Sequence, residues 1–197
     1  MKTWGKVIVA LVAIGAVVSL IQLRSGSRPV GSENLIGQPL PDFAAPLAQS
    51  GLRFDSNVFT PDQARLNKST AACNVKLSGS FNSCDGLPGR SVVVFWNADR
   101  QKCIDEVDQV DKVLSELDGV SAVAVAFNQP IEEVAPVVRE RGWKVPVVID
   151  RDGAVSALYS VAGCPTVFFA DDGEITNVRL SLQNAADLRR ELSADDG

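Results

Sequence analysis

The chain has 197 residues, a hydrophobic fraction of 46% and a formal net charge of −5 at pH 7. That length suits one ordinary domain with short attachments, and it is long enough to bury a proper core. The sequence contains no histidine, which excludes a Ser-His-Asp or Cys-His catalytic site, a His-ligated metal centre and axial His ligation of haem.

The first 34 residues differ in composition from the rest of the chain. Residues 1–6 form a short cationic start, and residues 7–23 follow as a run of 17 without a charge. This run is at the lower limit for crossing a hydrocarbon core of about 30 Å. A cleaved signal peptide fits the same pattern, but no convincing small-x-small cleavage site follows. We therefore predict a cytoplasmic start at 1–6, a transmembrane anchor at 7–23 and a flexible linker at 24–34.

The part of the chain from residue 35 onward is acidic. It holds 23 acidic and 15 basic residues, a net charge of about −8. Nucleic-acid binding requires clustered Lys and Arg, so this surface argues against a nucleic-acid partner.

The next stretch carries signals for an edge segment and a short helix. Prolines 39 and 41 suit the edge of a sheet, because hydrogen-bond donors of the ladder are not needed there. Thr60 before Pro61 is typical of an N-cap followed by proline at the first helical position, so we predict a helix over 61–67.

The four cysteines, at positions 73, 84, 103 and 164, include no Cys-x-x-Cys pair. That spacing argues against a structural metal, and an even number of cysteines behind an export signal favours disulfides. Cys73 and Cys84 bracket a polar segment that is too short to be held by packing. A disulfide closing it would stabilise the fold by roughly 3 kcal/mol, and we predict a structural bridge there.

The central part of the chain predicts a βαβ unit. The strand at 91–97 is apolar on both faces, as a strand covered by helices should be. The helix at 102–118 buries a stripe at spacings of three and four, and its charged residues are predicted to face water. The stripe is Val107, Val110, Leu114 and Leu117, and the charged residues are Asp105, Asp108, Asp111, Lys112 and Glu116. A parallel strand at 120–127 and a helix at 131–141 follow.

The last part of the chain predicts a ββα unit. A short strand at 145–150 is followed by a turn and the segment 154–159. Strands at 166–170 and 174–180 are joined by Asp-Asp-Gly, a strong hairpin signal. A helix at 184–192 closes the sheet and leaves a tail at 193–197. The class is therefore α/β, with a central sheet that has helices on both faces.

Three short motifs lie at the ends of these predicted strands and at the start of the predicted helix at 102–118. The central strand ends in Phe95-Trp96-Asn97, the next helix begins with Cys103-x-x-Glu106, and residues 161–166 read Val-Ala-Gly-Cys-Pro-Thr. With the Ile-Gly-x-x-Leu-Pro-Asp-Phe sequence at 36–43, they resemble the thioredoxin superfamily, and within it the membrane-anchored TlpA/ResA-like redoxins, which are related to the AhpC/TSA proteins.

This resemblance implies a thioredoxin-like fold over 35–192, with 44–89 as an extended insertion. It implies a cis peptide bond before Pro165, with Pro165 and Thr166 facing the active-site turn. It also favours a domain held on the extracytoplasmic side of the cell membrane by a single-pass anchor. The first cysteine of the family's Cys-x-x-Cys motif is absent, and Arg100 takes its place.

Three functions are consistent with this site. In the first, Cys103 and Cys164 form a redox pair that exchanges disulfides with a protein thiol client, provided that the Cα atoms can approach closely enough. In the second, Cys103 is the reactive cysteine of a peroxidase, although Arg100 replaces the Thr or Ser that would position the peroxide. In the third, the domain is catalytically inactive and binds a partner.

We predict the first function, with Cys103 and Cys164 as catalytic residues and with no cofactor and no metal. Trp96 and Arg100 belong to the active-site turn. Trp96 is predicted to serve packing and Arg100 to be a solvated turn residue.

Overall fold

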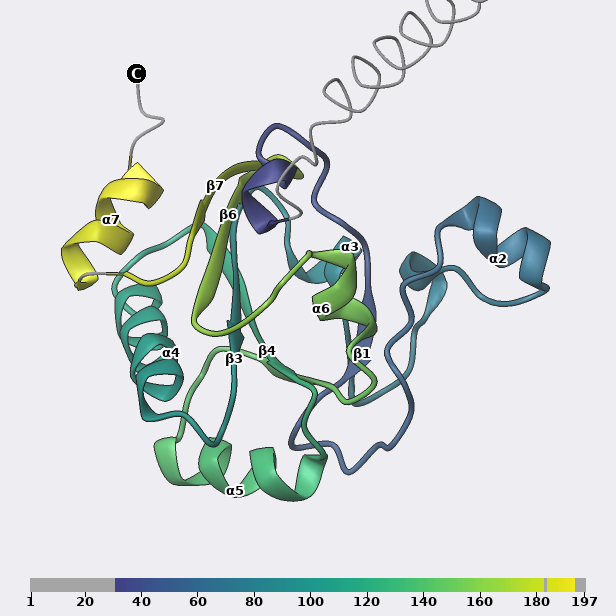
Figure 1. The fold of residues 1–197 in the computed structure, drawn as a ribbon, viewed down its shortest axis with the longest axis horizontal. Coiled ribbons are helices and arrows are strands. Elements are labelled where there is room, and N and C mark those ends of the chain that lie inside the picture. Colours follow the sequence, from purple (N-terminus) through teal and green to yellow (C-terminus); the bar gives the residue numbers. More distant parts are fainter. Residues whose placement is uncertain (1–30, 183, 194–197) are drawn as a thin grey trace, which may run out of the picture. The chain divides into compact units, whose positions relative to one another are not determined.

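A computed structural model describes residues 31–182 and 184–193, and these residues form an α/β domain with a thioredoxin-like fold (Figure 1). The helices and strands in chain order are η1 (Ser32–Leu35), β1 (Ala44–Pro46), α2 (Pro61–Asn67), η2 (Ala72–Asn74), β2 (Ser80–Asn82), α3 (Ser83–Gly86), β3 (Arg90–Trp96), α4 (Gln101–Leu114), β4 (Val120–Phe127), α5 (Ile131–Arg141), β5 (Val147–Asp150), α6 (Ala154–Leu158), β6 (Thr166–Asp171), β7 (Glu174–Arg179) and α7 (Ala185–Ser193).

The main sheet has five strands in the order β5-β4-β3-β6-β7. Strands β3, β4 and β5 are parallel to one another, and β6 and β7 run antiparallel to their neighbours. The predicted βαβ and ββα units are thus joined by the pairing of β3 with β6. In this pairing Phe95 lies opposite Thr166. This antiparallel pairing brings the carboxyl end of β3 and the amino end of β6 to the same end of the sheet.

Strand β3 contributes to a core on each face of the sheet. Val92, Val94 and Trp96 point to the face that α4 and α7 cover, while Val93 and Phe95 point to the other face. Figure 1 shows α4 and α7 on one side of the sheet, and α3 and α6 on the other. All five apolar residues of β3 are at most 1% exposed, as expected for a strand covered by helices on both sides.

The chain before β1 lies along the edge of the main sheet. The Gly37 N–H donates to Ile175 O over 2.8 Å, and the Leu40 N–H donates to Gly173 O over 2.7 Å. Pro39 lies between these two donors and bridges to Glu174. A proline needs no acceptor for its own nitrogen, so an edge position is compatible with it.

The insertion at 44–89 contains a second, two-stranded sheet, in which β1 and β2 pair antiparallel, and it also contacts β5 through Leu47 and Ala48. Helix α2 has the bounds that the sequence predicts, and Thr60 caps it. The Thr60 hydroxyl accepts from the Gln63 N–H, and the Gln63 side chain accepts from the Thr60 N–H. This reciprocal pair satisfies two of the four free N–H groups at the helix start.

Two boundaries differ from the prediction by more than one residue, and side chains bond the backbone at each of them. Helix α4 stops at Leu114 rather than 118, and the Ser115 hydroxyl donates to Lys112 O over 2.6 Å. Strand β5 begins at 147 rather than 145. The N–H groups of Lys144 and Val145 donate to the Asp111 carboxylate over 2.7 and 2.8 Å, so the chain is held there by a side chain instead of a strand ladder.

Two aspartates of α4 that were predicted to face water instead fix the turn before β5. Besides the bonds of Asp111, the Asp108 carboxylate accepts from the Trp143 Nε1–H over 2.6 Å and pairs with Arg141. The helical period places these side chains beside the buried stripe, where the turn from the next helix meets them.

The predicted linker at 24–34 extends too far. Ser32 is buried at the start of η1, and its hydroxyl donates to Ser160 O over 2.9 Å, so the folded domain begins before residue 35. The start at 1–6, the anchor at 7–23, residues 24–30 of the linker and residues 194–197 of the tail lie outside the described residues. Across the ranges described here, none of the helices is both long and apolar enough to cross a membrane.

Candidate active site

Cys103 lies at the third position of α4, just after the turn that follows β3. The Asn97 side chain accepts from the Asp99 N–H over 2.9 Å, and the Ala98 N–H donates to the Gln129 side chain over 2.6 Å. These two bonds hold the turn between strand and helix. Cys103 is 1% exposed and packs in the core beneath α4.

Cys164 comes from the loop between α6 and β6. The buried Asp150 carboxylate accepts from the N–H groups of Val155 and Ser156 over 3.0 and 2.8 Å, which holds the start of α6. Farther along, the Thr166 hydroxyl donates to Gly163 O over 2.7 Å. The Cys164-Pro165 peptide bond is cis, as the resemblance implies.

The two segments bring Cys103 and Cys164 together as a disulfide. Their Cα atoms are 5.6 Å apart, within the range of about 4.4–6.8 Å that a disulfide requires. The predicted pair is therefore present although 61 residues separate its members in the sequence. The two sulfurs differ in surroundings, because Cys103 is buried and Cys164 is partly exposed.

The other two residues of the predicted active-site turn face opposite ways. Trp96 is fully buried, and its ring meets that of Trp143 edge to face at a centroid distance of 5.0 Å. It serves packing, as the sequence predicts. Arg100 is exposed at the N-cap of α4 and has no ion-pair partner among the residues with described positions. Its guanidinium is thus free to meet solvent, as the sequence predicts.

Glu106 belongs to the Cys103-x-x-Glu106 motif, and its burial in this site was not predicted. Its side chain is on the same face of α4 as Cys103, and its carboxylate accepts from the Leu182 N–H over 2.5 Å and from the Ser181 hydroxyl over 3.5 Å. Burial raises the pKa of Glu106, and the bonds to Leu182 and Ser181 together with the charge of Lys102 oppose that rise in part. Its position three residues after Cys103, next to the buried Val107, is the signal that could have shown its burial.

Replacing Glu106 by glutamine tests this desolvation through the pH dependence of stability. A carboxyl whose pKa is raised in the folded state stabilises the fold while it is protonated and loses that contribution as pH rises from 4.5 through the raised value. The amide cannot ionise and still accepts from Leu182. We expect Glu106→Gln to gain stability relative to the native chain between pH 4.5 and pH 8 in urea unfolding. Glu140→Gln, which changes an exposed carboxyl, should show no such trend, and a Glu106→Gln difference that is flat with pH would refute the idea.

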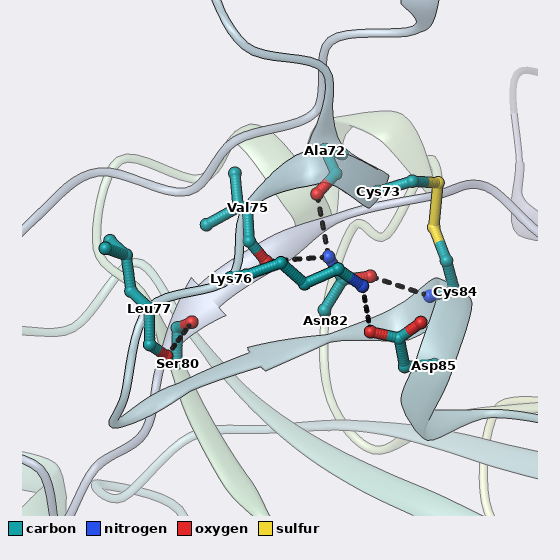
Figure 2. Close-up of polar contacts among 9 residues, drawn as sticks. All are labelled: Ala72, Cys73, Val75, Lys76, Leu77, Ser80, Asn82, Cys84 and Asp85. Atoms are coloured by element: carbon teal, nitrogen blue, oxygen red, sulfur yellow. Dashed lines mark hydrogen bonds and ion pairs between the residues drawn. A yellow bond between two sulfur atoms is a disulfide. The ribbon is translucent and has the colours of Figure 1, made fainter.

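The second predicted disulfide, Cys73–Cys84, is also present, with Cα atoms 5.5 Å apart. Figure 2 shows Asn82 at the centre of the loop that this disulfide closes. The Asn82 amide donates to Ala72 O over 2.9 Å and to Val75 O over 3.0 Å, and it accepts from the Cys84 N–H over 3.0 Å. A buried side chain therefore holds the loop together with the disulfide.

Asp42, Cys73 and Cys84 are ligand-type side chains whose ligand atoms lie within 4.8 Å of one another. The two sulfurs are bonded to each other, and a zinc site would need them as separate thiolates. In the oxidised state this group is a disulfide with a carboxylate beside it.

Comparisons with known proteins place this geometry in context. The chain is 28% identical over 154 residues to the thiol-disulfide oxidoreductase ResA of Geobacillus kaustophilus, which covers 75% of this chain and 88% of that protein. It is 30% identical over 135 residues to ResA of Halalkalibacterium halodurans, which covers 65% and 76%.

Among solved structures, a thiol:disulfide interchange protein from Chlorobium tepidum matches with a TM-score of 0.59 and 18% identity, over 81% of this chain and 96% of that one. A secreted disulfide oxidoreductase of Mycobacterium tuberculosis matches with a TM-score of 0.54 and 18% identity, over 59% and 90%. These likenesses show the shared fold. The model of the AhpC/TSA family matches residues 36–178, and the chain therefore belongs to the AhpC/TSA family.

Proposed function

We propose that this protein is a thiol-disulfide oxidoreductase whose redox-active pair is Cys103 and Cys164. The observation that carries the proposal is the disulfide between the first turn of α4 and the loop before β6. The ResA relatives, which match over most of their length, are named for the same chemistry. The proposed clients are protein thiols or disulfides.

The location of this pair is suited to exchange. A cysteine in the first turn of a helix gains from the free N–H groups and the helix dipole, which favour thiolate over thiol. Cys164 is partly exposed and lines a surface cavity, so the thiol of a client can approach the disulfide. Exchange proceeds by attack of a thiolate on one sulfur, and its rate depends on such access.

In the oxidising direction, a client dithiol gives up two electrons and its sulfurs become joined. The Cys103–Cys164 bond breaks in the same cycle, and both cysteines end as thiols. The reverse cycle reduces a client disulfide. Both directions are balanced without a metal or a cofactor.

We further propose that the protein acts on the extracytoplasmic side of the cell membrane, held by a single-pass anchor at residues 7–23. The apolar run and the cationic residues before it support this placement. Alkaline extraction of membranes should leave the full chain in the pellet, and protease added outside the cytoplasmic membrane should digest the domain. A chain released by alkali would contradict the anchor.

A redox titration of the full chain tests the pair. Samples equilibrated at a series of potentials are quenched by alkylation, and the cysteine pairs are mapped by peptide mass spectrometry. We expect the Cys103–Cys164 pair to open well above about −300 mV, the level below which structural disulfides typically lie, and the Cys73–Cys84 pair to open at lower potential. If Cys103–Cys164 opens only when the protein unfolds, the proposal is wrong and a binding role takes its place.

A further inference from the structure

The two cysteines of the redox pair are unequally exposed. Cys103 is 1% exposed and packs among residues of the α4 core, including Trp96 and Val107. Cys164 is partly exposed and packs against the same core from its edge. A thiolate that attacks a disulfide must reach one sulfur directly, and burial of Cys103 blocks that approach on one side.

A cavity of about 440 Å³ opens beside Cys164. Its walls include Ser32 and Glu33 from η1, Pro165 from the loop, and Leu180 after β7. Leu180 is 64% exposed. The cavity leads an incoming sulfur to Cys164. The segment around residue 32 that forms one wall is held in place by the bond from the Ser32 hydroxyl to Ser160 O.

We infer that Cys164 on the proline loop supplies the sulfur that bonds to clients, and that Cys103 on the helix supplies the sulfur released from the disulfide. This inference rests on the proposed function. The client-facing sulfur thus comes from the loop, and the helix supplies the buried partner. Cys164 is then a catalytic residue that forms the mixed disulfide, and Cys103 resolves that mixed disulfide in the reducing direction.

The step is balanced as follows in the oxidising direction. A client thiolate attacks Cys164 Sγ and forms a client–Cys164 bond, while the Cys164–Cys103 bond breaks and its electron pair leaves on Cys103 Sγ. The helix N-terminus favours this leaving thiolate, which then takes a proton from solvent. A second client thiolate attacks the client sulfur, the client disulfide forms, and Cys164 leaves as thiolate. In the reducing direction, Cys164 attacks the client and Cys103 closes the disulfide.

Two full-length variants in a Cys73→Ala/Cys84→Ala background test this order. Cys103→Ser leaves only Cys164, and Cys164→Ser leaves only Cys103. Each reduced variant is mixed with the aromatic disulfide 5,5′-dithiobis(2-nitrobenzoate), and the second-order rate of thiolate release is recorded. We expect Cys103→Ser to react at least about tenfold faster than Cys164→Ser, because reaction rate follows sulfur access. Equal rates, or a faster Cys164→Ser, overturn the inference.

A second measurement does not depend on the folding of either variant. The oxidised native chain is mixed with a short peptide that carries one cysteine, quenched in acid, and mapped by mass spectrometry. The peptide is expected on Cys164. An adduct on Cys103, in a protein whose pair opens in the redox titration, overturns the assigned order and leaves the proposed function standing. A pair that fails to open in the titration removes both.

Discussion

Replacing either Cys103 or Cys164 by serine is expected to reduce catalysed thiol–disulfide exchange by at least about a hundredfold. A full cycle stores two electrons in the pair, and one remaining thiol can form only a mixed disulfide that it cannot resolve. The measurement is steady-state oxidation of a dithiol peptide by the full chain with glutathione disulfide to reoxidise the pair, or reduction of the peptide disulfide with glutathione to reduce it. Because the two residues act as one unit, the double variant should lose no more activity than either single variant.

The matched control for this experiment is the Cys73→Ala/Cys84→Ala variant, which removes the other disulfide. We expect its exchange rate to stay within about twofold of the native rate, since that disulfide lies in the insertion and not in the redox pair. A Cys164→Ser variant that kept full activity would contradict the proposed pair. If Cys164→Ser also consumed hydroperoxide, and Cys103→Ser did not, the peroxidase function would replace the proposed exchange function.

The same control variant is expected to lose stability. A disulfide that closes a loop of this length restricts the unfolded chain, and its removal should lower the free energy of unfolding by about 3 kcal/mol. Asn82 should keep the loop folded without it, because its amide still bonds Ala72 O, Val75 O and the Cys84 backbone N–H. Urea unfolding of native and variant chains, both with Cys103–Cys164 oxidised, measures the difference.

Asn82→Ala provides the companion variant for this prediction. It leaves two carbonyls and one N–H without their side-chain partner, which should cost roughly 2–3 kcal/mol with the disulfide intact. Since Asn82 and the disulfide hold one loop, the combined variant should deviate from the sum of the separate losses. A Cys73→Ala/Cys84→Ala variant as stable as the native chain would show that Asn82 alone holds the loop.

The sequence was sufficient to predict the elements that follow a strong pattern. Strand β4 and helices α2 and α5 have the predicted bounds, because a regular period, a cap or a terminal glycine marks each of them. The nearness of Cys103 and Cys164 was implied by the resemblance to the thioredoxin superfamily, in which the proline loop faces the active-site turn, and the pairing of β3 with β6 accounts for it.

The parts that the sequence did not predict depend on contacts between distant segments. Asp108 and Asp111 are like other exposed aspartates until the turn around residue 143 lies against α4 and offers them donors. Glu106 is named in the Cys103-x-x-Glu106 motif, but its donor at Leu182 comes from 76 residues away in the sequence. The local pattern of apolar and polar residues does not predict partners that are distant in sequence.

The distance along the chain between Cys103 and Cys164 links oxidation to folding. In a Cys-x-x-Cys pair, the thiols are neighbours whether or not the protein is folded. Here the thiols are 61 residues apart in sequence, so the native fold alone provides their effective concentration. On the loop-entropy model, closing so long a loop is worth about 4 kcal/mol. Reduced and oxidised forms should therefore melt at different temperatures, which makes heat resistance a direct reporter of the redox state of this pair.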